Sequence, residues 1–188
     1  MSDERFKPLV LEELHEFQRP LGEQIMKVSS IGLDGPYRLL LRSPVLGQRV
    51  YDLLYYLRWN SSIPMRLSEF AILIIGRQWT SQVEWFAHAP IAAKAGLAQS
   101  IIDDLKARRR PAGMQADESA VHDFLTELMA THRVSDETFA RAKAIFNEQQ
   151  IVDLTAVAGT YVMVAMLLSM GDIPVPAGKI APFGPDDA

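Results

Sequence analysis

The sequence predicts an all-α protein, a single-domain bundle of about eight helices. Apolar residues recur at the 3.6-residue spacing of helices along nearly the whole chain. No segment shows the two-residue alternation of a strand, and no hairpin dipeptide or glycine-rich phosphate loop is present. The 188 residues are enough for one substantial core. We therefore expect one domain over 1–188, with a proline-rich tail at 171–188.

The first sixty residues are predicted to form three helices. The first covers 9–28, where Pro20 should kink or divide it. A short second helix covers 37–42. Ser43 is a good N-cap, and the proline that follows it suits a first helical turn, so the third helix should run over 44–60.

Two consecutive helices at the centre of the chain organise the prediction. The helix over 67–80 is almost wholly apolar, and the helix over 82–95 is amphipathic with ionisable side chains. Only a short connection separates them, so they should be antiparallel neighbours. Gly96 is expected at the C-cap of the second helix.

Four further helices are predicted after this pair, over 98–109, 117–131, 137–146 and 148–170. The apolar segment 151–170 is long enough to span a bilayer. Its flanks carry no cluster of lysine or arginine, and its small residues suit close packing. We interpret it as the central helix of a bundle or of a subunit interface, and not as a membrane span.

Composition and charge exclude several functions. The net charge is −4, and the compact basic cluster Lys106 to Arg110 is expected to complement the dipole of a helix end, so nucleic acid is not an expected partner. The chain contains no cysteine, which excludes disulfides, thiolate metal sites and thiol peroxidase chemistry. The first residues lack an apolar signal-peptide region, so a cytoplasmic location is expected.

Three ionisable residues of the central helices form the candidate catalytic site. Glu84 and His88 are four residues apart and share one helix face. Glu69 lies in the apolar helix before them, where a carboxylate needs a partner or a shifted pKa. We expect the three to converge as an acid–base set, in which His88 carries the proton, Glu84 orients His88, and Glu69 is held protonated.

Other interpretations of these residues remain open. An isolated Glu–His pair at this spacing is commonly a surface salt bridge. One histidine and two carboxylates make a thin ligand set for zinc, so neither a metal nor a cofactor is expected. Arg66 or Arg77 could anchor a substrate carboxylate, although a helical arginine is more often solvated or ion-paired.

The central stretch 66–97 also resembles a known superfamily. The residues that carry the resemblance are Glu69, Glu84, Trp85, His88, Ala92, Gly96 and Leu97. They are similar to the carboxymuconolactone decarboxylase and alkylhydroperoxidase D-like superfamily. Its peroxidase branch has cysteines twelve and fifteen residues after the glutamate and a histidine nineteen after it, where this chain has Ser81, Glu84 and His88. The resemblance implies the cysteine-free decarboxylase branch, an all-α fold and a homotrimer or homohexamer.

Two functions follow from these observations. The first is a cofactor-free proton-transfer lyase or isomerase that acts on a small carboxylated lactone or ring acid. The second is an oligomeric small-molecule binding protein that kept the fold without thiol peroxidase activity. An enclosed set of Glu69, Glu84 and His88 beside a pocket would favour the first function. The sequence does not identify the substrate, because pocket shape depends on helices that it does not place.

Overall fold

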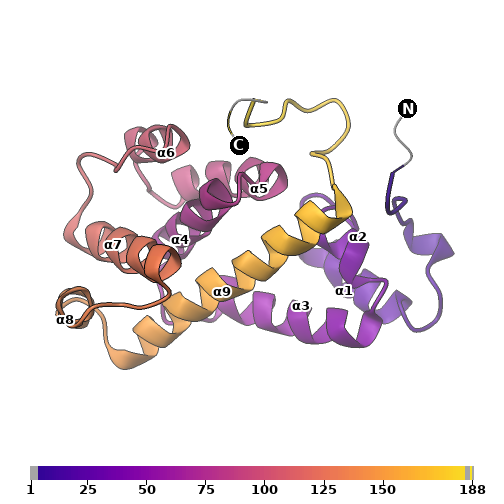
Figure 1. Ribbon diagram of the computed structural model, residues 1–188. Coiled ribbons are helices and arrows are strands. Elements are labelled where there is room, and N and C mark those ends of the chain that lie inside the picture. The colour runs from indigo at the N-terminus through magenta and orange to yellow at the C-terminus, as the bar shows by residue number, and fades with distance from the viewer. Residues whose placement is uncertain (1–3, 185–186, 188) are drawn as a thin grey trace.

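The computed structural model describes residues 4–184 and 187, which form nine α-helices, one 3₁₀ helix and no strand (Figure 1). This confirms the all-α, single-domain prediction. Residues 1–3, 185–186 and 188 of the predicted domain and tail lie outside the described residues. The elements are η1 (Leu11–Glu13), α1 (Arg19–Val28), α2 (Pro36–Leu40), α3 (Pro44–Trp59), α4 (Met65–Gln78), α5 (Gln82–Lys94), α6 (Gln99–Lys106), α7 (Ala116–Thr131), α8 (Asp136–Lys143) and α9 (Glu148–Gly171).

Helix α4 is the centre of the bundle. It packs against α5, α7 and α9, and every residue from Leu67 to Arg77 is buried. The apolar side chains of Phe70, Leu73 and Ile75 are completely inaccessible to solvent. Burying one such side chain contributes about 1.5–3 kcal/mol, so this helix forms only together with the helices around it.

The long apolar helix α9 crosses the whole molecule diagonally and contacts α2, α3, α4, α7 and α8 (Figure 1). Its length and composition would allow it to cross a membrane, but 56% of its most apolar window is buried inside the bundle. It is therefore a core helix of this fold. Val152, Met166 and Met170 remain at least half exposed on it.

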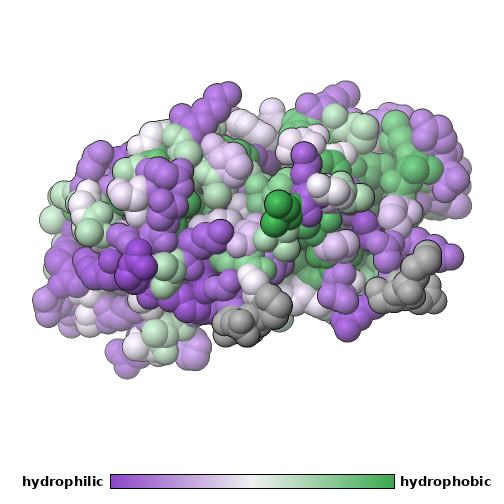
Figure 2. All heavy atoms as spheres, turned by 90° about the horizontal axis from the view of Figure 1, so that it is seen from above, coloured by the Kyte–Doolittle hydropathy of each residue, from purple (hydrophilic) through white to green (hydrophobic). Residues whose placement is uncertain are grey.

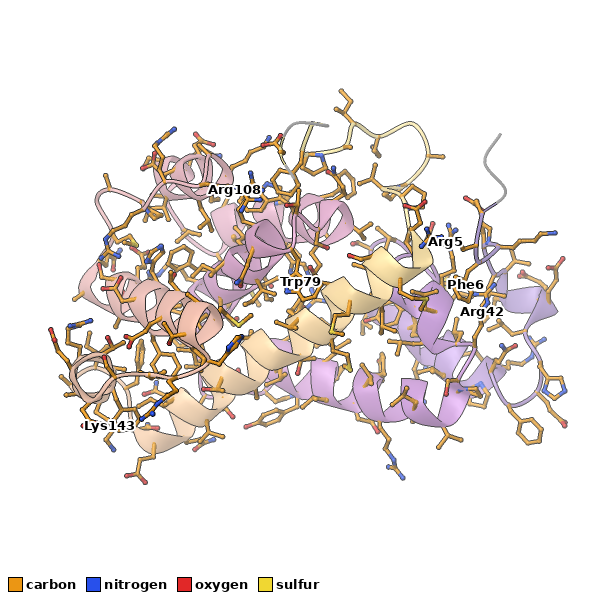
Figure 3. All side chains as sticks on the ribbon, in the orientation of Figure 1. Arg5, Phe6, Arg42, Trp79, Arg108 and Lys143 are labelled. Atoms are coloured by element: carbon orange, nitrogen blue, oxygen red, sulfur yellow. The ribbon has the colours of Figure 1, made fainter. Side chains whose placement is uncertain are left out.

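The N-terminal helix is shorter than predicted. The expected helix over 9–28 is divided, and α1 begins only at Arg19. Pro20 occupies its first turn, where its missing N–H costs no intrahelical hydrogen bond. Arg5 donates to the carbonyl of Met170 at 2.8 Å, so the preceding segment is tied to the end of α9 (Figure 3).

One predicted helix end is confirmed and another is wrong. Ser43 stands at the N-cap of α3 and Pro44 begins the helix as predicted, although the Ser43 side chain makes no capping hydrogen bond. Helix α6 ends at Lys106, and Arg108 has a left-handed φ of 57°, so the basic cluster lies mostly beyond the helix. Arg109 and Arg110 instead pair with carboxylates, those of Asp104 and Asp123.

The proline-containing C-terminal segment packs over the start of α5. The Phe183 ring is buried, with its centroid 5.2 Å from that of Trp85 and 4.7 Å from the guanidinium carbon of Arg77. The side-chain amide of Gln82 accepts from the backbone N–H of Phe183 at 2.9 Å and donates to its carbonyl at 3.0 Å. Elsewhere on the face in Figure 2, hydrophobic atoms are interspersed with polar ones.

Candidate active site

Helices α4 and α5 place all three predicted site residues. A short connection with a left-handed Thr80 (φ 49°) turns the chain from α4 into α5. The helices then approach closely, because a Cβ at Gly76 would lie 3.6 Å from the Cβ of Glu84. This packing brings Glu69 of α4 beside the face of α5 that carries Glu84 and His88, and all three side chains are buried.

Glu69 and His88 form a buried pair. The distance between His88 Nδ1 and Glu69 Oε2 is 2.7 Å, and the two residues are 7% and 3% exposed. A carboxylate at this distance fixes the proton of a neutral imidazole on Nδ1, which leaves Nε2 as the basic nitrogen. The ring of Tyr161 from α9 packs edge-on against the imidazole at a centroid distance of 5.0 Å.

Glu84 has a different environment. Both of its carboxyl oxygens are buried, and neither has a hydrogen-bond partner within residues 4–184 and 187. Burial raises the pKa of Glu84 to about 8, and the nearby hydroxyl of Ser81 offsets only part of that rise. Glu84 is therefore mostly protonated at neutral pH and can act as a neutral acid.

The structure reverses the roles expected for the two carboxyl groups. Glu69, not Glu84, contacts His88, and burial raises the pKa of Glu84, the group that was expected to orient the histidine. Glu84 and His88 share a helix face, but the ring of His88 binds across the interface to α4. The helical spacing predicts which side chains share a face, while the facing helix decides which of them pair.

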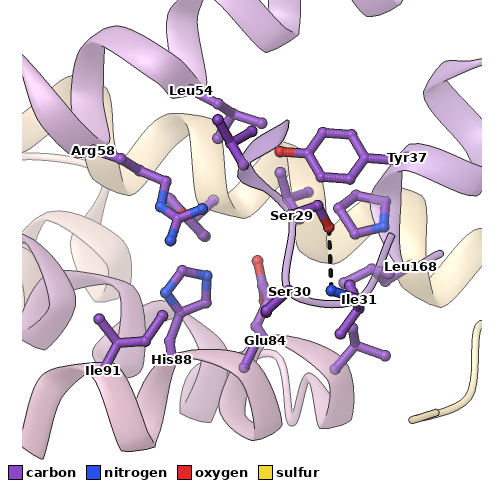
Figure 4. Close-up of a pocket in the computed structure, with 16 residues that line it drawn as sticks. Ser29, Ser30, Ile31, Tyr37, Leu54, Arg58, Glu84, His88, Ile91 and Leu168 are labelled. Carbon is purple, nitrogen blue, oxygen red and sulfur yellow. Dashed lines mark hydrogen bonds between the residues drawn. The ribbon is translucent and has the colours of Figure 1, made fainter. Parts of the chain in front are cut away.

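Glu84 and His88 line a cavity of about 260 Å³ (Figure 4). Glu69 lies behind His88 and is not part of the lining. The lining comes from α1, the loop after it, α2, α3, α5 and α9. The sixteen lining residues are Val28, Ser29, Ser30, Ile31, Pro36, Tyr37, Leu54, Arg58, Val83, Glu84, Ala87, His88, Ile91, Tyr161, Val164 and Leu168.

Three polar lining residues were not predicted from the sequence: Tyr37, Arg58 and Tyr161. They lie on α2, α3 and α9, and no local motif connects them to the central pair. The signals available were indirect, namely an aromatic residue at the start of α2, a basic residue near the end of α3 and an aromatic residue in the middle of α9. Their meeting at one cavity depends on tertiary packing, which spacing along the chain does not give.

The arginines considered as substrate anchors have structural partners instead. Arg66 pairs with Asp117 and Glu118 of α7. Arg77 donates to the carbonyl of Lys106 at 2.7 Å and pairs with Asp187 at 3.2 Å. Neither guanidinium lines the cavity.

Three other ring side chains near the central helices lie outside the cavity. His122 is 9% exposed, and Arg110 and Asp123 contact its ring. Trp79 is 38% exposed at the end of α4 (Figure 3). Trp85 is buried and packs against Phe183. In residues 4–184 and 187, no three His, Asp or Glu side chains are arranged to hold a metal ion.

Comparison with solved structures identifies the fold. A peroxidase-related protein from Ralstonia eutropha JMP134, described as an alkylhydroperoxidase AhpD core, matches with a TM-score of 0.77 and 12% identity over 92% of each chain. One from Silicibacter sp. TM1040 matches with a TM-score of 0.75 and 14% identity over 93% of this chain and 94% of that one. An alanine variant of the debrominase Bmp8, in complex with 2,3,4-tribromopyrrole, matches with a TM-score of 0.73 and 13% identity over 94% of each chain.

No protein-family model matches the sequence, and no curated protein matches it. The chain has the alkylhydroperoxidase D-like fold over nearly its full length, as the resemblance in the central stretch implied. At 12–14% identity the comparisons do not carry an activity across.

Proposed function

We propose that the protein is a cofactor-free lyase or isomerase that moves a proton on a small carboxylated lactone or ring acid. The observation that carries the proposal is the buried Glu69–His88 hydrogen bond of 2.7 Å behind a cavity that Glu84 also faces. A base oriented by a carboxylate and a separate neutral acid in one cavity are the groups that such chemistry needs.

The two groups divide the work of an isomerisation. Nε2 of His88 takes a proton from a carbon next to a conjugated carbonyl, and the electron pair moves onto the carbonyl oxygen. Glu69 stabilises the imidazolium that forms, because its carboxylate already accepts from Nδ1. The protonated Glu84 then delivers a proton to a second carbon of the conjugated system, and the double bond moves.

A decarboxylation uses the same groups. The bond between the ring carbon and the leaving carboxylate breaks, its electron pair moves into the conjugated carbonyl, and carbon dioxide leaves. Glu84 or the His88 imidazolium protonates that carbon, so one proton replaces one carbon dioxide. The substrate provides the electron sink and the protein provides the proton, so the step balances without a further reactant.

The size of the cavity supports a small ring as substrate. A volume of about 260 Å³ fits a monocyclic molecule with few substituents. The similarly folded debrominase binds tribromopyrrole, which is also a single small ring. The cavity walls other than the polar residues are aliphatic, as in most small-molecule sites.

Incubation with a panel of unsaturated lactone acids in deuterated water tests the proposal. Proton NMR should detect deuterium entering a ring carbon, and carbon dioxide release should accompany any decarboxylation. The alternative is a small-molecule binding protein without turnover. Panel members that bind, but neither exchange a proton nor lose carbon dioxide, would establish that alternative.

A further inference from the structure

We infer that Arg58 is the anion anchor of the cavity and selects small ring monocarboxylates over neutral and dianionic analogues. The ligand class rests on the proposed function, but the anchor can be tested without turnover. Arg58 lies in the last turn of α3. Figure 4 shows its guanidinium directed into the space that the imidazole of His88 faces from α5.

Arg58 differs from the other arginines that are withdrawn from solvent. Among the described residues, four arginines are buried or half-buried: Arg38, Arg58, Arg66 and Arg77. Arg38, Arg66 and Arg77 each form a salt bridge with a carboxylate. Arg58 forms none within the described part of the chain. A half-buried cation without a counterion is costly unless a ligand supplies the charge.

The fixed positive charge of the cavity lining comes from this residue. Arg58 is the only lysine or arginine among the described lining residues. Burial raises the pKa of Tyr37 and Tyr161, and the charge of Arg58 acts against that rise at both hydroxyls. The field of Arg58 therefore reaches across the cavity.

Trp59 holds the guanidinium in place. The guanidinium carbon lies 4.5 Å from the centroid of the indole ring, so the ring covers one face of the planar cation. The N–H groups at its edge remain free to bind a carboxylate with two parallel hydrogen bonds. Stacking on Trp59 thus orients the guanidinium of Arg58 before a ligand binds. Trp59 acts as a positioning residue.

The other lining residues indicate which groups the bound anion has besides its carboxylate. Leu54, Ile91, Val164 and Leu168 provide aliphatic walls for a ring, and Glu84 and His88 line the same cavity as Arg58. A second carboxylate there would approach Glu84 and the Glu69–His88 pair without a second fixed cation. One anchor and an acid–base pair therefore suit a ligand with a single negative charge.

Calorimetric titration with benzoate, benzamide and isophthalate tests this selection. Benzoate is the monoanion, benzamide its neutral counterpart and isophthalate the dianion. The protein should bind benzoate at least about tenfold more tightly than either analogue, as expected for one charge-assisted hydrogen-bonded pair. In the NMR spectrum, benzoate should shift the signals of His88 and leave those of the exposed His15 unchanged.

Substitution of Arg58→Gln should weaken benzoate binding roughly ten- to hundredfold and leave benzamide binding unchanged. Arg58→Lys keeps the positive charge but loses the planar guanidinium. Its benzoate affinity should fall between those of the wild-type protein and Arg58→Gln. Arg49→Gln is the matched control, because Arg49 is exposed on the same helix and does not line the cavity. Trp59→Leu should weaken benzoate binding less than Arg58→Gln does and leave benzamide binding unchanged, so the preference for benzoate should fall in part.

Two results would overturn the assignment. One is equal affinity of the wild-type protein for benzoate and benzamide, including no binding of either. The other is benzoate affinity that is the same in Arg58→Gln and Arg49→Gln. Failure of the proposed function looks different, because benzoate would still bind through Arg58 while no lactone acid was turned over.

Discussion

Nδ1 of His88 lies 2.7 Å from Oε2 of Glu69, on the side of the imidazole that faces away from the cavity. The pair leaves the other ring nitrogen toward the ligand space. Glu84, one helical turn before His88, has no hydrogen-bond partner in the described chain. The two carboxyl groups therefore have different roles because their environments differ. Glu69 is the counterion of His88, and Glu84 is a neutral acid.

Replacement of His88 by Gln should abolish most turnover and preserve the fold. The amide can still donate to Glu69, so the buried carboxylate keeps a partner. It cannot carry a proton, and the loss of a general acid–base group lowers the rate by at least roughly a hundredfold. Turnover of a lactone acid and the circular dichroism spectrum would check both parts. His15→Gln, at an exposed position, is the control and should keep full activity.

Replacement of Glu69 by Gln should lower activity through the position and charge of His88. The amide oxygen can still accept from Nδ1, so the melting temperature should change little. The imidazolium loses its counterion, and we expect kcat to fall roughly a hundredfold with little change in KM. A wild-type kcat in this variant would show that Glu69 only fills space in the core.

The resemblance and the helical pattern predicted which side chains meet, but not how they pair. Glu69 in an apolar helix, with Glu84 and His88 one turn apart in the next, was enough to expect convergence. The pairing depends on which way the ring of His88 turns when α5 packs on α4. That choice is made by tertiary contacts such as the close approach at Gly76 and the ring of Tyr161.

Arg66 should prove structural when replaced by Met. Its guanidinium neutralises Glu118, which is 1% exposed, and Asp117. Removing one partner of a buried pair leaves an uncompensated charge, so the unfolding free energy should fall by about 3–5 kcal/mol. Urea denaturation measures this. Arg141→Met breaks an exposed pair and should cost less than about 1 kcal/mol. Equal effects of the two substitutions would contradict the structural role.

The arginine that reaches the cavity could not be chosen from the sequence. Arg58 and Arg77 lie on predicted helices and Arg66 directly precedes one, and each has neighbours that would allow a buried or an exposed position. Arg66 and Arg77 point to α7 and to the C-terminal segment, where carboxylates meet them. Only the placement of α3 across from α5 makes Arg58 a lining residue. Long-range packing, and not local propensity, decides this part of the site.

We also propose that the chain forms a homo-oligomer, a trimer or hexamer as the resemblance implied. Val152, Met166 and Met170 on α9, and Trp59 at the end of α3, are 43–65% exposed, which is unfavourable for apolar side chains in water. Light scattering at micromolar concentration should give three or six times the chain mass of 21.0 kDa. Met166→Glu should dissociate the assembly if α9 lies at the interface, whereas a wild-type mass of one chain would contradict the proposal.

Replacement of Glu84 by Gln should change how stability depends on pH. The pKa of Glu84 is about 8 in the folded protein and about 4.5 when exposed. Between these values the unfolded chain releases a proton that the folded protein keeps, so this group lowers stability as the pH rises, by at most about 1.4 kcal/mol per pH unit. Below pH 4.5 both states are protonated and Glu84 adds no pH dependence.

The difference between the Glu84→Gln and wild-type unfolding free energies should therefore be small at pH 5 and should grow by a few kcal/mol in favour of Gln at pH 8. Hydrogen bonds from Ala112 to Asp104 and from Thr138 to Glu127 lower the pKa of each carboxyl below its ordinary value of 3.8 or 4.5, so their effects fall outside this window. Urea denaturation of both proteins from pH 5 to pH 8.5 measures the difference. A constant difference across that range would mean that Glu84 is ionised in the folded state and has found a partner.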